Sequence, residues 1–275
     1  MRPFTQVDVF ATTPYAGNPL AVVLDGEGLD TDEMLRFAAW TNLSETTFLL
    51  PPTSAAADYR VRIFTPDAEL PFAGHPTLGT CHAWLEAGGR PRSEGAVVQE
   101  CGAGLVTLRR TDDGLAFQAP PLTRSGPVEE ELVQRIAAAL GITRDGVLDA
   151  AWADNGPGWV AVLLPDAASV LALRPGLVPV DVGVVGPYPA GSPCDVEVRA
   201  FFPLRGSTVE DPVTGSLNAA LGQWLIGTGR APRSYVASQG TALGRAGRVH
   251  VSADDDGAVW VAGSVVTCVS GQVAL

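Results

Sequence analysis

The chain has 275 residues, of which 46% are hydrophobic and 17% charged, so it can bury one large or two ordinary globular cores and is not a disordered chain. Its formal net charge of −12 argues against nucleic acid as a partner, because phosphate contacts need basic patches. All 18 basic residues are arginines, and the absence of lysine excludes Schiff-base, pyridoxal phosphate and P-loop lysine chemistry.

The first half of the chain alternates strands with two helices. Residues 20–24 form a continuous apolar strand of the kind that is buried on both faces. Asp30, with Glu33 three residues later, forms a capping box that predicts a helix through about Trp40. The remaining predictions are strands at 7–10, 46–50 and 58–64, a helix from Pro76 to the Gly88-Gly89 pair, and antiparallel strands over 97–118.

Two stretches about half the chain apart share Asp, Val, Arg, Phe and Pro in their first part and Pro and Gly in their second part. Each is typical of an alternating strand, a Gly/Pro loop and the start of a helix. The first runs Asp-Tyr-Arg-Val-Arg-Ile-Phe-Thr-Pro to Pro66 and then Gly-His-Pro-Thr-Leu-Gly-Thr to Thr80. The second runs Asp-Val-Glu-Val-Arg-Ala-Phe-Phe-Pro to Pro203 and then Glu-Asp-Pro-Val-Thr-Gly-Ser to Ser216. An apolar strand and a hairpin recur in the same order, so we interpret the chain as an internal duplication.

The duplication predicts an α+β fold with two halves, each a mixed sheet wrapped on helices, that face each other across a cleft. We place the N-terminal half at residues 1–122 and the C-terminal half at 123–275. Prolines and polar residues at 119–127 indicate a linker, and a helix is predicted over 128–140. A functional site is expected where the two halves meet.

His75 and Asp211 occupy matching places in the two copies, each directly before a proline. Proline is favoured at the first position of a helix, so we expect His75 and Asp211 to be N-cap residues. Asp is among the best N-caps, and that role alone explains Asp211. A cationic His75 would oppose the helix dipole, so we expect a neutral imidazole that makes hydrogen bonds.

Two helix N-termini that point into one cleft form an anion site, for which a small molecule with a carboxylate is the natural ligand. The pairs Gly79-Thr80 and Gly215-Ser216 are expected one turn into the two helices, where small residues allow close approach and a hydroxyl can reach the ligand. We expect Gly74, Thr80, Gly215 and Ser216 to bind substrate. Helix packing is the alternative for Thr80 and Ser216.

Glu45 is the best acid/base candidate. It stands where the predicted helix gives way to a strand, ahead of the apolar residues 48–50, and partial burial there would raise the pKa of its carboxyl toward the working pH. A surface glutamate in a turn is the alternative. A metal site is disfavoured, because His250 lies in a hairpin far along the chain from His75 and His82.

The chain shows no signal for a membrane or for secretion. No apolar run approaches the roughly 20 residues of a membrane helix. The N-terminal residues lack the continuous apolar stretch of a signal peptide. The four cysteines have no Cys-x-x-Cys spacing and are typical of buried thiols in a reducing compartment. We therefore expect a cytoplasmic protein.

Three motifs together resemble the phenazine-biosynthesis PhzF-like family: Asn-Leu-Ser-Glu-Thr-Thr-Phe around Glu45, Pro-Phe-Ala-Gly-His-Pro-Thr-Leu-Gly around His75, and Glu-Asp-Pro-Val-Thr-Gly-Ser around Asp211. The resemblance spans the chain. It implies the diaminopimelate-epimerase-like fold, with two pseudo-symmetric halves, each a mixed sheet around a central helix, and a last strand that can return to the N-terminal half. It further implies that Glu45 is the general acid/base, that His75, Asp211 and Ser216 line the active site, that no cofactor is used, and that the protein is a homodimer.

The related epimerases use one cysteine from each half, near the positions of Gly74 and Asp211, and none of the four cysteines falls there. A two-thiol mechanism is therefore excluded. The leading hypothesis is a cofactor-free isomerase that moves a proton between carbons of a small carboxylate-bearing substrate. It would be similar to family members that act on trans-2,3-dihydro-3-hydroxyanthranilate, with Glu45, His75 and Asp211 as catalytic candidates. The alternatives are an epimerase or racemase with Glu45 and Asp211 as paired bases, and a non-catalytic protein that binds a small acid.

Overall fold

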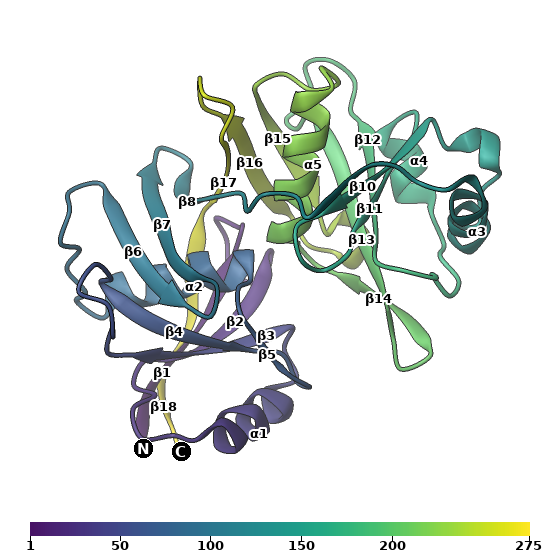
Figure 1. Ribbon diagram of the computed structural model, residues 1–275. Helices are drawn as coiled ribbons and strands as arrows, with labels where there is room; N and C mark the ends of the chain where they lie inside the picture. The colour runs from purple at the N-terminus through teal and green to yellow at the C-terminus, as the bar shows by residue number, and fades with distance from the viewer. The chain divides into compact units, whose positions relative to one another are not determined.

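The chain forms two compact units in a computed structural model that describes all residues from Met1 to Leu275 (Figure 1). Unit 1 comprises Met1–Gln118 and Ala262–Leu275, and unit 2 comprises Ala119–Val261. The boundary after Gln118 falls at the start of the proline-containing segment that the sequence indicates as a linker. None of the helices combines the length and the apolar character needed to cross a bilayer.

Unit 1 contains the first eight strands and the first two helices, and the last strand of the chain completes its sheet. Its elements are β1 (Arg2–Val9), β2 (Asn18–Val23), α1 (Thr31–Thr41), β3 (Glu45–Leu50), β4 (Tyr59–Phe64), β5 (Glu69–Leu70), α2 (Gly74–Glu86), β6 (Ala96–Cys101), β7 (Gly104–Thr111), β8 (Gly114–Gln118) and β18 (Val265–Val273). The predicted capping box of α1 is confirmed: the Asp30 side chain accepts from the Glu33 N–H, and the Glu33 side chain accepts from the Asp30 N–H.

The strands of unit 1 form a mixed sheet in the order β18-β1-β2-β3-β4-β6-β7-β8, with β5 paired to the end of β4. The pairs β2–β3 and β4–β6 are parallel, and the other pairs are antiparallel. Arg2 lies opposite Val273, so the two ends of the chain are neighbours in this unit (Figure 1). Helix α2 contacts strands from both ends of this order, β18 and β8, because the sheet curls around it.

Unit 2 repeats this arrangement. It contains β9 (Arg124–Pro127), α3 (Glu130–Leu140), the short 3₁₀ helix η1 (Arg144–Gly146), β10 (Asp149–Asp154), β11 (Val160–Leu163), α4 (Ala167–Ala172), β12 (Val182–Pro187), β13 (Val196–Leu204), β14 (Ser207–Asp211), α5 (Gly215–Gly227), β15 (Ser234–Gln239), η2 (Thr241–Leu243) and β16 (Gly247–Ala253). Strand β17 (Val259–Gly263) begins in unit 2 and ends in unit 1.

The order of strands in unit 2 is β9-β10-β11-β12-β13-β15-β16, with β14 beside the end of β13. The parallel pairs β11–β12 and β13–β15 stand where unit 1 has β2–β3 and β4–β6. Helices α4 and α5 likewise follow β11 and β14, as α1 and α2 follow β2 and β5. The predicted α+β class, with two halves that each wrap a mixed sheet around a central helix, is confirmed.

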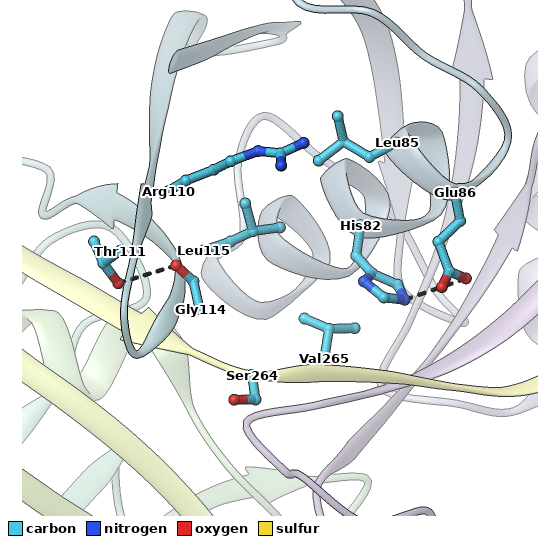
Figure 2. Close-up of a pocket in the computed structure, with 9 residues that line it drawn as sticks. All are labelled: His82, Leu85, Glu86, Arg110, Thr111, Gly114, Leu115, Ser264 and Val265. Carbon is cyan, nitrogen blue, oxygen red and sulfur yellow. Dashed lines mark hydrogen bonds and ion pairs between the residues drawn. The ribbon is translucent and has the colours of Figure 1, made fainter. Parts of the chain in front are cut away.

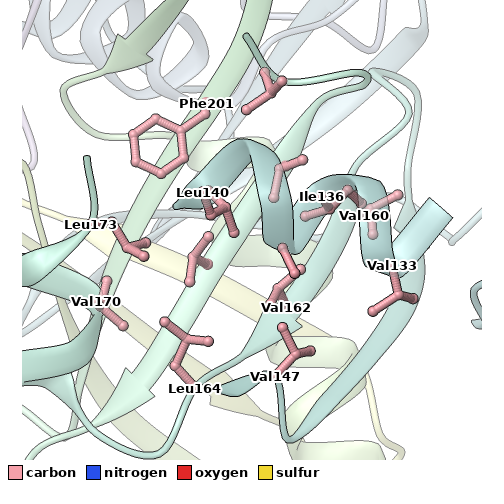
Figure 3. Packing of buried hydrophobic residues seen from close by; sticks show 14 residues of the cluster. Val133, Ile136, Leu140, Val147, Val160, Val162, Leu164, Val170, Leu173 and Phe201 are labelled. Carbon is pink, nitrogen blue, oxygen red and sulfur yellow. The ribbon is translucent and has the colours of Figure 1, made fainter. Parts of the chain in front are cut away.

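Each unit has its own apolar core. In unit 1 the aromatic rings of Phe4, Phe37, Phe48 and Phe64 meet edge to face, with centroids 5.6–6.2 Å apart. In unit 2, valines of β11 and β12 pack against α3 and α4 together with Ile136, Leu140 and Phe201 (Figure 3). In unit 1 the central helix α2 packs closely on the sheet at Gly79, where an added Cβ would lie only 2.6 Å from the side chain of Leu20.

The segment predicted as a linker is partly a strand. Residues Arg124–Pro127 form β9, which pairs with β10 and is exposed along its length. Proline and glycine are tolerated in such a short edge strand, because the N–H groups on its open side have no partner to lose. The composition of this segment is therefore compatible with an edge strand as well as with a linker, and composition alone does not distinguish a linker from an edge strand.

Candidate active site

Glu45 and His75 of unit 1 lie side by side. Glu45 is the first residue of β3, next to Leu20 of the parallel strand β2, and His75 is the second residue of α2. The Nε2 atom of His75 is 3.4 Å from the Oε2 atom of Glu45. The side chains of His75 and Glu45 are 5% and 16% exposed, respectively, so most of the contact is shielded from bulk solvent.

The imidazole of His75 is neutral. Burial lowers its pKa to about 3, although a hydrogen bond with the backbone of Pro19 works in the opposite direction. Proline has no backbone N–H, so the ring donates this bond to the Pro19 carbonyl. The Nε2 atom has no hydrogen-bond partner, so the nitrogen that donates to the Pro19 carbonyl is Nδ1. A neutral ring has one N–H, so Nε2 presents a lone pair toward Glu45.

The prediction that His75 is an N-cap is wrong. Helix α2 begins at Gly74, the N-cap is Ala73, and Pro76 is the third helical residue. The first four N–H groups of any helix lack an intrahelical partner, so proline fits anywhere in the first turn and its presence does not mark the first position. The hydrogen bond of the imidazole with the Pro19 backbone and the lowering of its pKa by burial both agree with the expected neutral ring.

The other candidates on α2, Gly74 and Thr80, are both buried. Gly74 opens the helix and is buried beside His75. Thr80 has no exposed surface, and its hydroxyl donates to Thr47 Oγ1 at 2.8 Å. Helix packing therefore accounts for Thr80, and a contact of Gly74 or Thr80 with substrate stays a prediction.

In unit 2, the prediction that Asp211 is an N-cap is also wrong. Asp211 is the last residue of β14, opposite Ala200, and α5 begins only at Gly215 after the N-cap Thr214. The buried side chain of Gln239 accepts a hydrogen bond from the Thr214 N–H, which fixes the helix start there. Asp211 still contacts this end of the helix, because its Oδ2 accepts from the Thr214 hydroxyl at 2.6 Å.

Ser216 lies in the first turn of α5 rather than one turn into it, since Gly215 is the first helical residue. Two side chains outside the helix hold it. The indole Nε1 of Trp159 donates to the Ser216 hydroxyl at 3.1 Å, and the Asn155 amide donates to the Ser216 carbonyl at 2.9 Å. Since the hydroxyl oxygen already accepts from Trp159, its own hydrogen is available to an acceptor.

The sequence reasoning missed Asn155 and Trp159. The signal was available: both belong to the block that repeats residues before and within the apolar strand at 20–24. That block was interpreted only as evidence of duplication, because a Gly/Pro turn before a buried strand has an ordinary structural explanation.

The thiols are not acid/base candidates. All four cysteines are free. Burial raises the pKa of Cys81 to about 12, so this thiol, on α2, stays protonated. No group of three or more His, Cys, Asp or Glu side chains is arranged to hold a metal ion.

Comparison with known proteins shows the family that the motifs resemble. The sequence model of the PhzC-PhzF family, "Phenazine biosynthesis-like protein", matches residues 7–271. Antisense-enhancing sequence 1 of Schizosaccharomyces pombe is 38% identical over 98% of this chain and 97% of its own length. A Pseudomonas aeruginosa protein named trans-2,3-dihydro-3-hydroxyanthranilate isomerase is 33% identical over 100% of both chains.

Solved structures agree in fold. The crystal structure of a PhzF-family phenazine biosynthesis protein from Bacillus anthracis superposes with a TM-score of 0.83 at 23% identity, covering 100% of this chain and 99% of that one. Together with the family match over nearly the whole length, the chain thus belongs to the PhzC-PhzF family of phenazine biosynthesis-like proteins.

Proposed function

We propose that this protein is an isomerase that uses Glu45 to move a proton between two carbons of one small, carboxylate-bearing substrate. The observation that carries the proposal is the shielded contact between Glu45 and a neutral His75, 3.4 Å apart. A general acid/base must release and take up a proton in each turnover. A cationic partner would hold Glu45 permanently as a carboxylate, whereas a neutral imidazole leaves both forms accessible.

His75 supports the protonated form of Glu45 in this proposal. Its Nδ1–H is engaged by the Pro19 carbonyl, so Nε2 can accept a hydrogen bond from the Glu45 carboxyl but cannot donate one. Glu45 would remove a proton from a carbon made acidic by conjugation, keep it while the electrons shift, and return it to another carbon of the same molecule. Because the imidazole stays neutral throughout, it positions the carboxyl without competing for the proton.

The substrate carboxylate and the negative charge that develops during the reaction need donors. Free N–H groups at the start of α2, beside Gly74 and His75, supply partial positive charge. In unit 2 we assign substrate binding to Gly215 and Ser216, because the hydroxyl of Ser216 is oriented by Trp159 and has a hydrogen to donate. Asp211 orients the same helix start through Thr214.

Two further expectations belong to this proposal. The shared order of strands and helices in the two units supports an origin by internal duplication. The homodimer implied by the family resemblance stays a prediction, which light scattering of the purified protein tests directly.

The function is tested by proton NMR of trans-2,3-dihydro-3-hydroxyanthranilate with the protein in deuterated water, with Glu45→Gln beside the wild type. The compound is chosen because the related Pseudomonas aeruginosa protein is named for its isomerisation. We expect conversion by the wild type and a loss of about 10³-fold in the variant, the range typical of a general acid/base. An active Glu45→Gln protein would contradict the assignment of the base.

The same spectra separate the alternatives. Isomerisation moves the double-bond system and places hydrogen or deuterium on a new carbon, whereas epimerisation inverts one carbon and exchanges its proton with solvent. No conversion of this compound by the wild type, with tight binding of an unchanged small acid, would instead favour the non-catalytic alternative.

A further inference from the structure

A cavity lies in unit 1, toward the opposite end of α2 from the Glu45–His75 pair. It has a volume of about 480 Å³, within the range of small-molecule sites (Figure 2). Its walls come from the last turns of α2, the β7–β8 hairpin and the start of β18. His82 follows His75 by seven residues, so the cavity is offset from the pair by roughly 10 Å along the helix axis.

The floor of this cavity is apolar and its two sides are polar. Leu85, Leu115 and Val265 form the apolar surface, and His82 and Arg110 face the cavity from opposite walls (Figure 2). An apolar surface with a few placed polar groups is the usual composition of a site for a small organic ligand.

Hydrogen bonds fix the tautomer of His82. Thr267 has one hydroxyl hydrogen, and it donates this to Glu86 Oε2 at 2.5 Å. The contact of 3.0 Å between Thr267 Oγ1 and His82 Nε2 must therefore have the imidazole as donor. Burial lowers the pKa of His82, against the opposing effect of Glu86, so the ring is neutral near pH 7. With the hydrogen on Nε2, the Nδ1 atom is an acceptor, on the side away from Glu86 (Figure 2).

Arg110 supplies the charge. It lies on β7, is exposed, and extends its guanidinium over the cavity toward Leu85 (Figure 2). No ion pair or side-chain hydrogen bond involves Arg110, in contrast to Arg62 and Arg199 of the two units. A guanidinium without a carboxylate partner at the rim of a cavity is suited to bind an anion with paired oxygens.

We propose that this cavity binds a small carboxylic acid that has an apolar or aromatic body and a hydroxyl or amine group. The carboxylate binds Arg110, the body lies on Leu85, Leu115 and Val265, and the hydroxyl or amine donates to His82 Nδ1. Glu86 also lines the cavity, and because it lies on the Nε2 side of the ring, where Thr267 donates to it, the ligand carboxylate is placed at Arg110 instead. The site is separate from the proposed catalytic one and takes a related class of molecule.

The test uses 3-hydroxybenzoate as the probe, followed by NMR of the imidazole protons. The chain has only three histidines, so the His82 signals are assigned with a single His82→Gln variant. We expect a saturable shift of the His82 signals, with weaker binding of benzoate, which lacks the hydroxyl, and still weaker binding of methyl 3-hydroxybenzoate, which lacks the charge.

Arg110→Gln is expected to weaken binding of the probe at least tenfold. Arg109→Gln is the matched control, because neighbouring residues of a strand point to opposite faces, and it should bind the probe as the wild type does. The same affinity in both variants, or no response of His82 up to the solubility limit of the probe, would overturn the proposal. A response of His75 reports on the proposed catalytic site instead, so failure of one site is distinguishable from failure of the other.

Discussion

The same arginine–glutamate pair occurs once in each unit, at different depths. Arg62 of β4 binds Glu69 of β5 through Nε and Nη2, and Arg199 of β13 binds Glu210 of β14 in the same way. Each guanidinium also lies about 5 Å from the ring of the phenylalanine two residues later on the strand. The pair in unit 1 is 20% and 39% exposed, but the pair in unit 2 is 5% and 13% exposed.

The surroundings of the two pairs explain the difference. Arg199 also donates to the carbonyls of Val170 and Leu173 at the end of α4, whereas Arg62 donates to the hydroxyl of Thr31 at the start of α1. The same motif can therefore contribute differently to the free energy of unfolding in the two units. Burial and the remaining partners decide whether an ion pair of one geometry is required for folding or is nearly neutral.

The central helices differ in a similar manner. The start of α2 has a carboxyl and a neutral imidazole in contact, which is a pair suited to proton transfer. The start of α5 has hydroxyl and amide groups around Ser216 and no histidine. We infer that a common scaffold serves proton transfer in unit 1 and ligand binding in unit 2.

The largest effect is expected for the isomerisation rate when the proposed proton-transfer residue of unit 1 is compared with a residue of unit 2. Glu45→Gln should lower the isomerisation rate about 10³-fold, because it removes the group that transfers the proton. Asp211→Asn should lower it only about tenfold, since the amide oxygen still accepts from Thr214 but without the charge that strengthens the bond. Rates of both variants are measured with the same substrate, and circular dichroism checks that each is folded. Equal losses of about 10³-fold would contradict the division and favour paired bases.

The second prediction compares the two ion pairs by stability. Arg199→Met should destabilise the protein by about 3 kcal/mol, because it leaves Glu210 buried without a counter-charge. Arg62→Met should cost about 0.5 kcal/mol, the range of an exposed pair. Urea unfolding followed by tryptophan fluorescence measures both.

A double variant makes the comparison sharper. Arg199→Met with Glu210→Leu removes both charges and should recover most of the stability lost in the single variant, because the main cost is the unpaired buried carboxylate. If the double variant is as unstable as Arg199→Met, the loss comes from the carbonyl contacts of Arg199 with α4 instead.

The local signals in the sequence predicted most of the fold. The capping box of Asp30 and Glu33 is present, the apolar strand at 20–24 is buried on both faces, and the strands predicted over 97–118 are antiparallel. These predictions were correct because each depends on residues a few positions apart. The family resemblance was equally readable, since its motifs are contiguous.

The starts of the central helices could not be predicted in this way. They depend on partners far along the chain: the Thr214 N–H is held by Gln239 of β15, and the His75 ring by the carbonyl of Pro19. The role of Trp159 has the same origin, because only the folded chain brings its indole to Ser216. The resemblance implied that Glu45 and His75 belong to one active site, but their contact and the geometry that makes His75 an acceptor came from the structure.

The third prediction uses a position where the units differ in charge. Asp181 directly precedes β12, and Ser44 directly precedes β3 at the corresponding place of unit 1. Burial, aided by repulsion from Asp154, raises the pKa of Asp181 to about 6, above the value of about 3.9 in an unfolded chain. The folded protein therefore binds this proton more tightly, and stability is lost as the pH rises from about 4 through about 6.

Asp181→Asn should thus stabilise the protein by about 1 kcal/mol at pH 8, a value reduced because the carboxyl is partly exposed, and the gain should vanish near pH 4. Urea unfolding at several pH values measures the gain. Ser44→Ala, the counterpart in unit 1, should change stability by an amount that does not depend on pH. A gain for Asp181→Asn that is constant with pH would show that the carboxyl is not the cause.

The smallest predicted effect tests the binding role of unit 2. Trp159→Phe removes the indole N–H that donates to Ser216 and keeps most of the buried ring. The Ser216 hydroxyl is then free to rotate, so its hydrogen is no longer directed toward the substrate. We expect KM to rise about fivefold, equivalent to one neutral hydrogen bond, with kcat unchanged, because the bond acts equally on the bound substrate and the transition state.

Trp84→Phe in α2 of unit 1, where the indole packs against Tyr59, is the control and should leave KM unchanged. If Trp159→Phe lowers kcat while KM stays the same, Ser216 stabilises the charge of the transition state. Unit 2 would then share in the chemistry that we assign to unit 1.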